Sequence, residues 1–259
     1  MSQSSHDDGA EAGGATSPSD AVGADPAATS PPRDFARTEV WIFDLDNTLY
    51  PASCDLFAQV DQKMGEFIER YLDVPFEQAR YLQKHYYRKF GTTLAGLMQV
   101  HKMEPTAFLD YVHDIDLTPV PVLPRLAAAI EALPGRKLIF TNGSRTHAER
   151  VAGKLGVLHL FEDICDIIAC GYVPKPDAAA YDYMLKTHAI AGERAAMFED
   201  MPHNLEVPHA VGMTTVLVHS DFIDHPAQAG IKTWTALPAH IHHQTEDLTA
   251  FLEALPGRP

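Results

Sequence analysis

The sequence predicts an α/β fold in which helices cover both faces of a doubly wound parallel sheet, with a separate helical segment inserted after the first strand. Short apolar runs of strand length recur along the chain. Segments of helical period alternate with them, and this alternation is typical of a parallel sheet. Nearly a hundred residues separate the first run from the second, whereas one strand-helix-strand unit needs only about 30. The spacing therefore predicts an inserted segment between these two runs.

Four apolar runs are the predicted strands. The first, Val40 to Phe43, ends at an acidic turn and is typical of a strand buried on both faces. The other three are Leu138 to Phe140, Ala195 to Phe198 and Thr214 to Val218. A helix is expected from Thr146 to Leu155, a short strand near His240 to His243, and a last helix near Asp247 to Leu255. Residues 36–53 and 121–259 are therefore predicted to form a Rossmann-like core.

The inserted segment, residues 54–120, is predicted to be a helical cap. Its apolar residues fall on one face at helical spacing, as in Leu56, Val60, Met64, Phe67, Ile68 and Tyr71. The proline-rich stretch 119–124 cannot continue a helix, so it is the expected linker back to the core.

Residues 1–35 are rich in Ser, Gly, Ala and Pro, and are predicted to be a disordered tail. The tail holds six acids and one arginine, so it carries five of the fifteen net negative charges. That acidity argues against a polymeric nucleic acid or an anionic membrane as partner, although a local positive pocket can still bind a small anion. Without a signal peptide or a long apolar stretch, the expected location is the cytoplasm.

The three cysteines and the histidines are interpreted mainly as packing or surface residues. Cys54, Cys165 and Cys170 have no spacing typical of a zinc site or a disulfide framework. The histidines near the end of the chain lack carboxylate or cysteine partners at zinc-like spacing. His203 is set apart because it lies in an acidic loop that could approach a ligand.

Polar side chains follow the predicted strands where ligands bind in parallel sheets, beyond the carboxyl ends. Asp44 and Asp46 follow the first strand, and Thr141-Asn142 follow the second. Glu199-Asp200 end the third, and Lys175 lies between two prolines. Carboxylates, a cation and neutral donors together suit a phosphate ester, because its negative charge must be neutralised before an anionic group can attack it.

These motifs, in this order, resemble the haloacid dehalogenase (HAD) superfamily of aspartate-nucleophile phosphatases over about residues 39–255. Its four motifs correspond, in order, to Asp44-x-Asp46-x-Thr48, Thr141-Asn142, Lys175 and Glu199-Asp200. Three stretches also resemble its pyrimidine 5′-nucleotidase subgroup: Asp44 to Pro51, Phe90 to Leu97, and Thr141 to Val151.

The resemblance implies that Asp44 attacks phosphorus and that Asp46 protonates the leaving alcohol, then activates water. Asp46 is therefore expected to carry a proton at the start. Mg²⁺ is the implied cofactor, bound by the Asp44 carboxylate, the Asp46 backbone carbonyl and Asp200. Thr141, Asn142 and Lys175 are the implied phosphate-binding residues.

Further residues are implied to support the site. Thr48, Glu199 and Asn204 are expected around it, with Glu199 reaching the metal through water and Asn142 and Asn204 holding loops. Thr92 and Thr93 are candidates for a loop that faces the substrate. Pro208 follows Asn204 by four residues, so the helix expected there begins later than in relatives.

The leading hypothesis is a phosphomonoesterase that hydrolyses nucleoside monophosphates such as UMP or CMP. A sugar phosphate, pyridoxal phosphate or nicotinamide mononucleotide stays open as substrate. Transfer of the phosphoryl group to another metabolite and a non-catalytic phosphate-binding regulator are the alternatives. A 2-haloacid dehalogenase is disfavoured, because ester cleavage needs the acid that Asp46 supplies and dehalogenation does not. Oligomeric state is not readable from the sequence.

Overall fold

The computed structural model of the protein describes residues 33–222, 228 and 230–255. Most of the predicted tail, residues 1–32, lies outside the described residues. Phe35, at the end of that predicted tail, packs on the folded core: its ring stacks on Trp41 at 5.7 Å between centroids and meets Phe251 edge to face at 5.9 Å.

The sheet has six strands in the order β3-β2-β1-β4-β5-β6, and every neighbouring pair is parallel. The strands are β1 (Val40–Phe43), β2 (Arg136–Phe140), β3 (Asp163–Cys165), β4 (Ala195–Glu199), β5 (Thr214–Val218) and β6 (His243–Thr245). The predicted α/β fold class is confirmed. The strand expected near His240 to His243 begins only at His243, and β3 was not predicted because three residues are too short to give a pattern.

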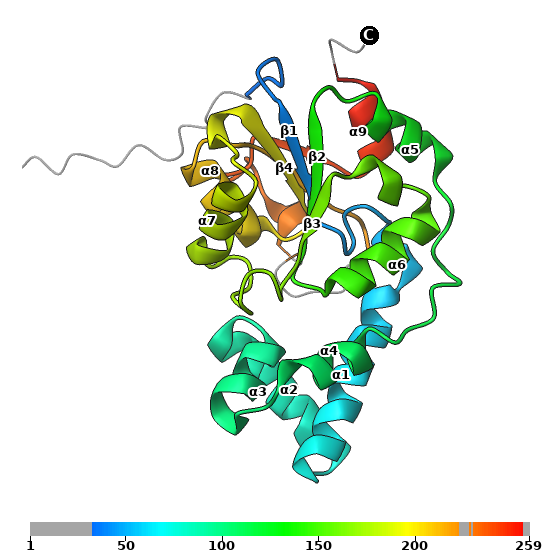
Figure 1. The fold of residues 1–259 in the computed structure, drawn as a ribbon, viewed down its shortest axis with the longest axis vertical. Helices are drawn as coiled ribbons and strands as arrows, with labels where there is room; N and C mark the ends of the chain where they lie inside the picture. Colours follow the sequence, from blue (N-terminus) through cyan, green and yellow to red (C-terminus); the bar gives the residue numbers. More distant parts are fainter. Residues whose placement is uncertain (1–32, 223–227, 229, 256–259) are drawn as a thin grey trace, which may run out of the picture.

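Helices cover both faces of this sheet (Figure 1). On one side lie α5 (Pro124–Glu131), α6 (Arg145–Leu155) and α9 (Leu248–Glu253); on the other lie α7 (Ala178–Thr187) and α8 (Glu206–Ala210). Residues of the central strand β1 alternate between the two apolar clusters, with Trp41 and Phe43 in one and Val40 and Ile42 in the other. This two-sided burial explains why β1 is apolar throughout.

Four helices between β1 and β2 form a lobe beyond the carboxyl ends of the strands (Figure 1). We call this lobe the cap: α1 (Leu56–Leu72), α2 (Phe76–Phe90), α3 (Thr93–His101) and α4 (Pro105–Val112). Its helices enclose an apolar interior that includes Val60, Ile68 and Phe108. No helix in the part of the chain that the structure describes is both long enough and apolar enough to cross a membrane.

Short 3₁₀ helices connect several of these elements: Ala52–Cys54, Leu158–Leu160, Gly192–Arg194, Pro202–Leu205 and Ile231–Thr233. The one at Pro202–Leu205 contains Asn204 and precedes α8, which begins at Glu206. Pro208 lies in the first turn of α8, where its missing N–H has no partner to lose. The helix therefore begins after Asn204, as the position of Pro208 requires.

Candidate active site

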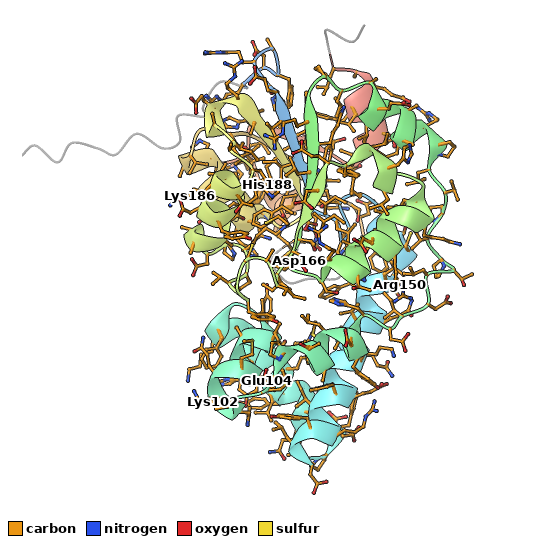
Figure 2. The ribbon with its side chains drawn as sticks, viewed as in Figure 1. Lys102, Glu104, Arg150, Asp166, Lys186 and His188 are labelled. Carbon is orange, nitrogen blue, oxygen red and sulfur yellow. The ribbon has the colours of Figure 1, made fainter. Side chains whose placement is uncertain are left out.

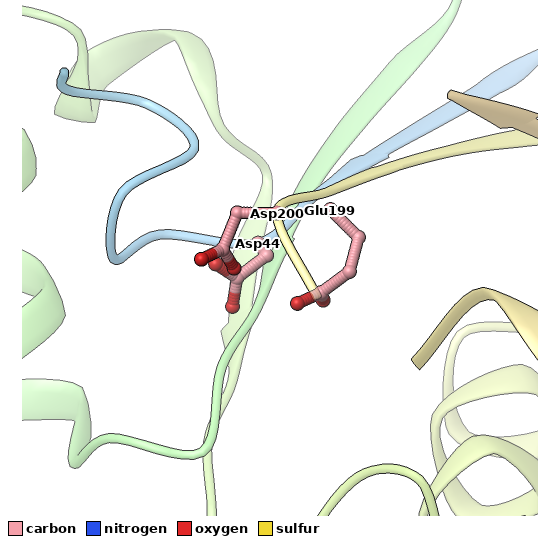
Figure 3. A group of neighbouring side chains, drawn as sticks. All are labelled: Asp44, Glu199 and Asp200. Carbon is pink, nitrogen blue, oxygen red and sulfur yellow. The ribbon is translucent and has the colours of Figure 1, made fainter. Parts of the chain in front are cut away.

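Polar residues at the carboxyl ends of β1, β2 and β4 meet at the floor of a cavity of about 650 Å³ between core and cap. Asp44 extends the ladder one residue beyond β1, because its backbone N–H donates to the Phe198 carbonyl at 2.9 Å. Glu199 is the last residue of β4 and Asp200 follows it. The parallel register of β1 and β4 therefore brings the three carboxylates to one point (Figure 3).

The Lys175 ammonium lies between two of these carboxylates. Its Nζ donates to Asp44 Oδ1 at 2.7 Å, to Glu199 Oε2 at 2.7 Å and to the Phe140 carbonyl at 2.8 Å. Burial alone would lower the pKa of Lys175, but the charges of Asp44 and Glu199 raise it above its usual range. Lys175 therefore stays positively charged although only 3% of it is exposed.

Asn142 holds the loop that carries Lys175. Its Nδ2 donates to the Lys175 carbonyl at 3.1 Å, and its Oδ1 accepts from the Lys175 backbone N–H at 2.8 Å. Both ends of the amide are bonded to the Lys175 backbone, which agrees with the expected loop-holding place of Asn142, whereas its implied phosphate binding stays a prediction. The neighbouring Thr141 accepts a hydrogen bond from the Gly143 N–H at 2.9 Å and can still donate its own hydroxyl proton to an anion.

The carboxylates of Asp44, Glu199 and Asp200 have ligand atoms within 4.8 Å of one another, and all three residues are buried. Burial and the charge of Glu199 raise the pKa of Asp44 to about 7 in spite of Lys175. Burial and the charges of Glu199 and Asp44 also raise the pKa of Asp200 well above its usual value. One lysine does not balance three carboxylates, and the all-oxygen donor set fits a hard divalent cation such as Mg²⁺.

Two amides support this group of acids. Asn204 Nδ2 donates to Glu199 Oε1 at 3.0 Å, which agrees with the supporting place expected for Asn204. Gln228 Nε2 donates to Asp200 Oδ2 at 2.7 Å. Gln228 was not predicted, because nothing in the residues around it distinguishes it from an ordinary loop glutamine. Thr48 is buried beside the site, and its hydroxyl has no hydrogen-bond partner among the described residues.

Asp46 also lines the cavity, but its carboxylate has different neighbours. Tyr50 donates its hydroxyl to Asp46 Oδ1 at 2.8 Å, and His147 Nε2 lies 2.9 Å from the same oxygen. Burial would raise the pKa of Asp46, but the charge and hydrogen bond of His147, together with the Tyr50 hydroxyl, lower it to about 2. With this lowered pKa Asp46 is a carboxylate in the free protein, so the proton expected on it at the start of the reaction stays a prediction for the protein with substrate bound.

The partners of Asp46 were missed by the sequence analysis. Tyr50 and His147 both lie in stretches that resemble the nucleotidase subgroup, so the motifs contained them without assigning them a task. His113, whose ring stacks on that of His147, follows the last cap helix and carries no motif. The contacts of His147 with Asp46 and with His113 join residues far apart along the chain, so they follow only from the fold.

The cap supplies the other wall of the cavity. Thr92 and Thr93 both line it, and their hydroxyls have structural partners as well: Thr92 caps α3 through the Ala95 N–H, and Thr93 donates to the Gln83 carbonyl. Arg88 and Tyr87 of α2 also face the cavity. On the core side, His203 lies in the wall, as its position in the acidic loop had suggested.

The arrangement combines a buried carboxylate just after the first strand with a helical lobe inserted after that strand. Residues 38–212 match the family model described as haloacid dehalogenase-like hydrolase. The match covers more than half of the chain, and the protein belongs to this family.

A curated relative and three solved structures resemble the chain. Phosphate metabolism protein 8 of Saccharomyces cerevisiae is 26% identical over 203 residues, which are 72% of this chain and 63% of that protein. The chain thus spans less than two thirds of that relative.

Among solved structures, a HAD phosphatase from Thermococcus onnurineus is 14% identical with a TM-score of 0.55, covering 85% of this chain and 99% of the other. A magnesium-bound HAD hydrolase from Bacillus subtilis is 13% identical with a TM-score of 0.54, at coverages of 85% and 99%. An L-2-haloacid dehalogenase is 14% identical with a TM-score of 0.54, at 84% and 99%. At these identities the matches establish the fold alone.

Proposed function

We propose that the protein is a Mg²⁺-dependent phosphomonoesterase in which Asp44 is the nucleophile. One observation carries the proposal: the Asp44 carboxylate lies at the cavity floor, 2.7 Å from a buried ammonium, with a second carboxylic acid two residues further on. A haloacid dehalogenase shares the fold and the aspartate, but it has no need of an acid for its leaving group. Asp46 therefore favours ester hydrolysis.

Negative charge is the main obstacle to this reaction, because a carboxylate must approach a phosphate. Lys175 neutralises part of that charge, and the Thr141 hydroxyl donates to a phosphoryl oxygen. Magnesium held by Asp44, Asp200 and the Asp46 backbone carbonyl would supply the remaining positive charge. Glu199 keeps Lys175 and the loop of Asn204 in place through its two oxygens.

The reaction has two steps. Asp44 attacks phosphorus, the ester P–O bond breaks, and the leaving oxygen takes a proton from Asp46. Asp46, now a carboxylate, takes a proton from the water that attacks the phosphorus of the aspartyl-phosphate, and the Asp44–phosphate bond breaks. Because Asp46 is ionised in the free protein, it must take its first proton from solvent when substrate binds. The negative charge of the bound phosphate raises the pKa of Asp46 and favours this.

A nucleoside monophosphate such as UMP or CMP is the proposed substrate class. The motif resemblance supports it, and a cavity of about 650 Å³ lies within the range of roughly 300–1,000 Å³ typical of small-molecule sites. Phe57 of the cap adds an aromatic side chain to the cavity wall against which a base can pack, and Arg88 adds a cation. We further propose that residues 54–120 act as the cap domain and that the protein works in the cytoplasm on this small substrate.

The test is a phosphate-release screen with Mg²⁺ across pyrimidine and purine monophosphates, sugar phosphates, pyridoxal phosphate and nicotinamide mononucleotide. UMP and CMP should give the highest kcat/KM, and Asp44→Asn should release no phosphate from any of them. Activity restricted to another ester would remove the nucleotide proposal and leave the phosphatase standing. Wild-type protein that cleaves no ester would remove both.

A further inference from the structure

The two oxygens of Asp46 lie in different surroundings. Oδ1 accepts the Tyr50 hydroxyl at 2.8 Å and contacts His147 Nε2 at 2.9 Å, so its lone pairs are occupied. Oδ2 faces the loop after β2, where a Cβ placed on Gly143 would lie 3.7 Å from it. The side chain of Asp46 is 28% exposed, and it lines the cavity. A proton exchanged with a substrate therefore belongs on Oδ2.

His147 can act as a fixed donor to Oδ1. Its side chain is 2% exposed, and Nδ1 is buried with no hydrogen-bond partner in the part of the chain that the structure describes. Oδ1 is an acceptor that already accepts the Tyr50 hydroxyl, so the Nε2 that lies 2.9 Å from it is the ring nitrogen that donates a proton toward Asp46.

The His147 ring is held from three sides. His113, the residue after cap helix α4, stacks on it at 4.4 Å between centroids and 16° between planes. The Ser144 hydroxyl bonds His113 Nδ1 at 3.0 Å and also accepts the His147 backbone N–H at 3.3 Å. On the third side the ring fits against Gly143, where a Cβ would come within 3.2 Å of His147 Cδ2.

The stack also joins the cap exit to the core. Arg150, on α6 where the core faces the cap (Figure 2), donates to the His113 carbonyl at 2.7 Å and to the Ile115 carbonyl at 3.2 Å. The segment that leaves the cap is thus fixed to the same helix that carries His147. The contacts that hold the segment leaving the cap therefore also hold the His147 ring that contacts Asp46.

We infer that His147 is a positioning residue that holds Oδ1 of Asp46, with Tyr50, so that Oδ2 alone delivers and receives the catalytic proton. His113 keeps the His147 ring in that orientation. The inference rests on the proposed phosphatase function, and it adds a requirement: protonation of the leaving group depends on a histidine about a hundred residues away from Asp46 in the sequence.

The experiment compares His147→Leu with His147→Gln on two esters. An alkyl monophosphate such as UMP needs protonation of its leaving oxygen, whereas p-nitrophenolate leaves readily without it. In His147→Leu, kcat/KM for UMP should fall about 10- to 100-fold, since a catalytic group displaced by about 1 Å loses on this order. For p-nitrophenyl phosphate it should fall less than about threefold. His147→Gln keeps an N–H donor of similar reach and should recover most of the UMP activity.

His188→Leu is the matched control. His188 is also buried, beside Arg136 at the start of β2 and so at the opposite edge of the sheet, and it is labelled in Figure 2. Its replacement should change kcat/KM for the two esters by the same factor. Equal losses on the two esters in His147→Leu, or no loss at all, would overturn the positioning role.

A second readout does not depend on turnover. In ¹H–¹⁵N spectra of the full chain with labelled histidine, the signal that His147→Gln removes should be that of a ring that carries a proton on Nε2. A ring with no proton on Nε2 would refute the inference. If wild-type protein cleaved neither ester, the proposed function would fail, and the spectrum would still decide how Asp46 is held.

Discussion

Asp44 and Asp46 are two residues apart on one loop, yet their surroundings shift their pKa values in opposite directions. Asp44 faces Glu199 and Asp200, and burial together with Glu199 raises its pKa to about 7. Asp46 faces His147 and Tyr50, which lower its pKa to about 2 although burial acts in the other direction. Burial raises the pKa of both carboxyl groups, and the neighbours that the fold brings to each one decide whether that rise persists, as at Asp44, or is reversed, as at Asp46.

In the proposed reaction this contrast suits the two carboxylates to different tasks. The acid cluster around Asp44 has excess negative charge and therefore calls for a cation, which in turn makes Asp44 available as a carboxylate. The donors around Asp46 already stabilise its charge, so Asp46 suits the second step, in which it must accept a proton from water. Environments that separate the pKa values of two neighbouring carboxyl groups are a recurring basis for distinct catalytic roles.

Asp44→Asn should cause the largest loss. An amide cannot form the phosphoryl-enzyme, so kcat for a nucleoside monophosphate should fall about 10⁴-fold or more, as when nucleophiles are removed from other hydrolases. Phosphate release under Mg²⁺ measures it. Because Asn is nearly isosteric, melting temperatures should confirm that the fold survives. Retention of more than a few per cent of activity in a folded variant would reassign the nucleophile.

Lys175→Met should destabilise the protein by about 3–5 kcal/mol, because it removes one partner from a buried set of charges. Urea unfolding in the presence of a chelator gives the free energy. Adding Asp44→Asn to Lys175→Met should recover part of the loss, since the acid cluster then holds one charge fewer. If the double variant were no more stable than Lys175→Met alone, the acids would not be repelling one another.

The pH dependence of stability separates the two carboxylates further. The pKa of Asp44 is raised to about 7 in the folded state. Its contribution to stability is therefore fully present below its pKa in the unfolded chain, about 4, and is lost as the pH rises through about 7. In the presence of a chelator, the free energy of unfolding of Asp44→Asn should therefore rise relative to that of wild type by about 1–3 kcal/mol between pH 4 and pH 7. Saturating Mg²⁺ should remove the gain, and a pH-independent difference would contradict the raised pKa.

Tyr50→Phe should have the smallest effect, about 1–2 kcal/mol of stability at neutral pH, because it removes one donor from a charged acceptor. In an Asp46→Asn background the cost should shrink. Tyr181→Phe is the matched control, since that buried hydroxyl donates to the neutral Asn204 carbonyl at 2.6 Å. The stability cost of Tyr181→Phe should be the same in the wild-type and Asp46→Asn backgrounds.

The sequence predicted most of what local patterns can carry. The apolar run Val40 to Phe43 and the acids after it identified β1 and the floor of the site, because a strand buried on both faces leaves a continuous signal. The motif order placed Lys175 and Glu199 near Asp44. The three-residue strand β3 was missed because it is shorter than any pattern of alternation.

The protonation of Asp46 could not be predicted in the same way. Its histidine partner is 101 residues distant in the sequence, and the side chain that holds that histidine comes from the end of the cap. Pattern and motif identify residue types and the edge of the sheet to which they belong. They do not say which donor will meet which oxygen, and that pairing sets the charge.

In the proposed reaction Asp44 becomes phosphorylated during turnover. Quenching the steady-state reaction with acid and mapping the peptides by mass spectrometry detects this phosphate, because an acyl phosphate survives acid long enough to be located. Phosphate is expected on Asp44 in wild-type protein and on no peptide of Asp44→Asn. Substrate that is hydrolysed with no phosphorylated peptide, or with the phosphate on another side chain, would contradict it.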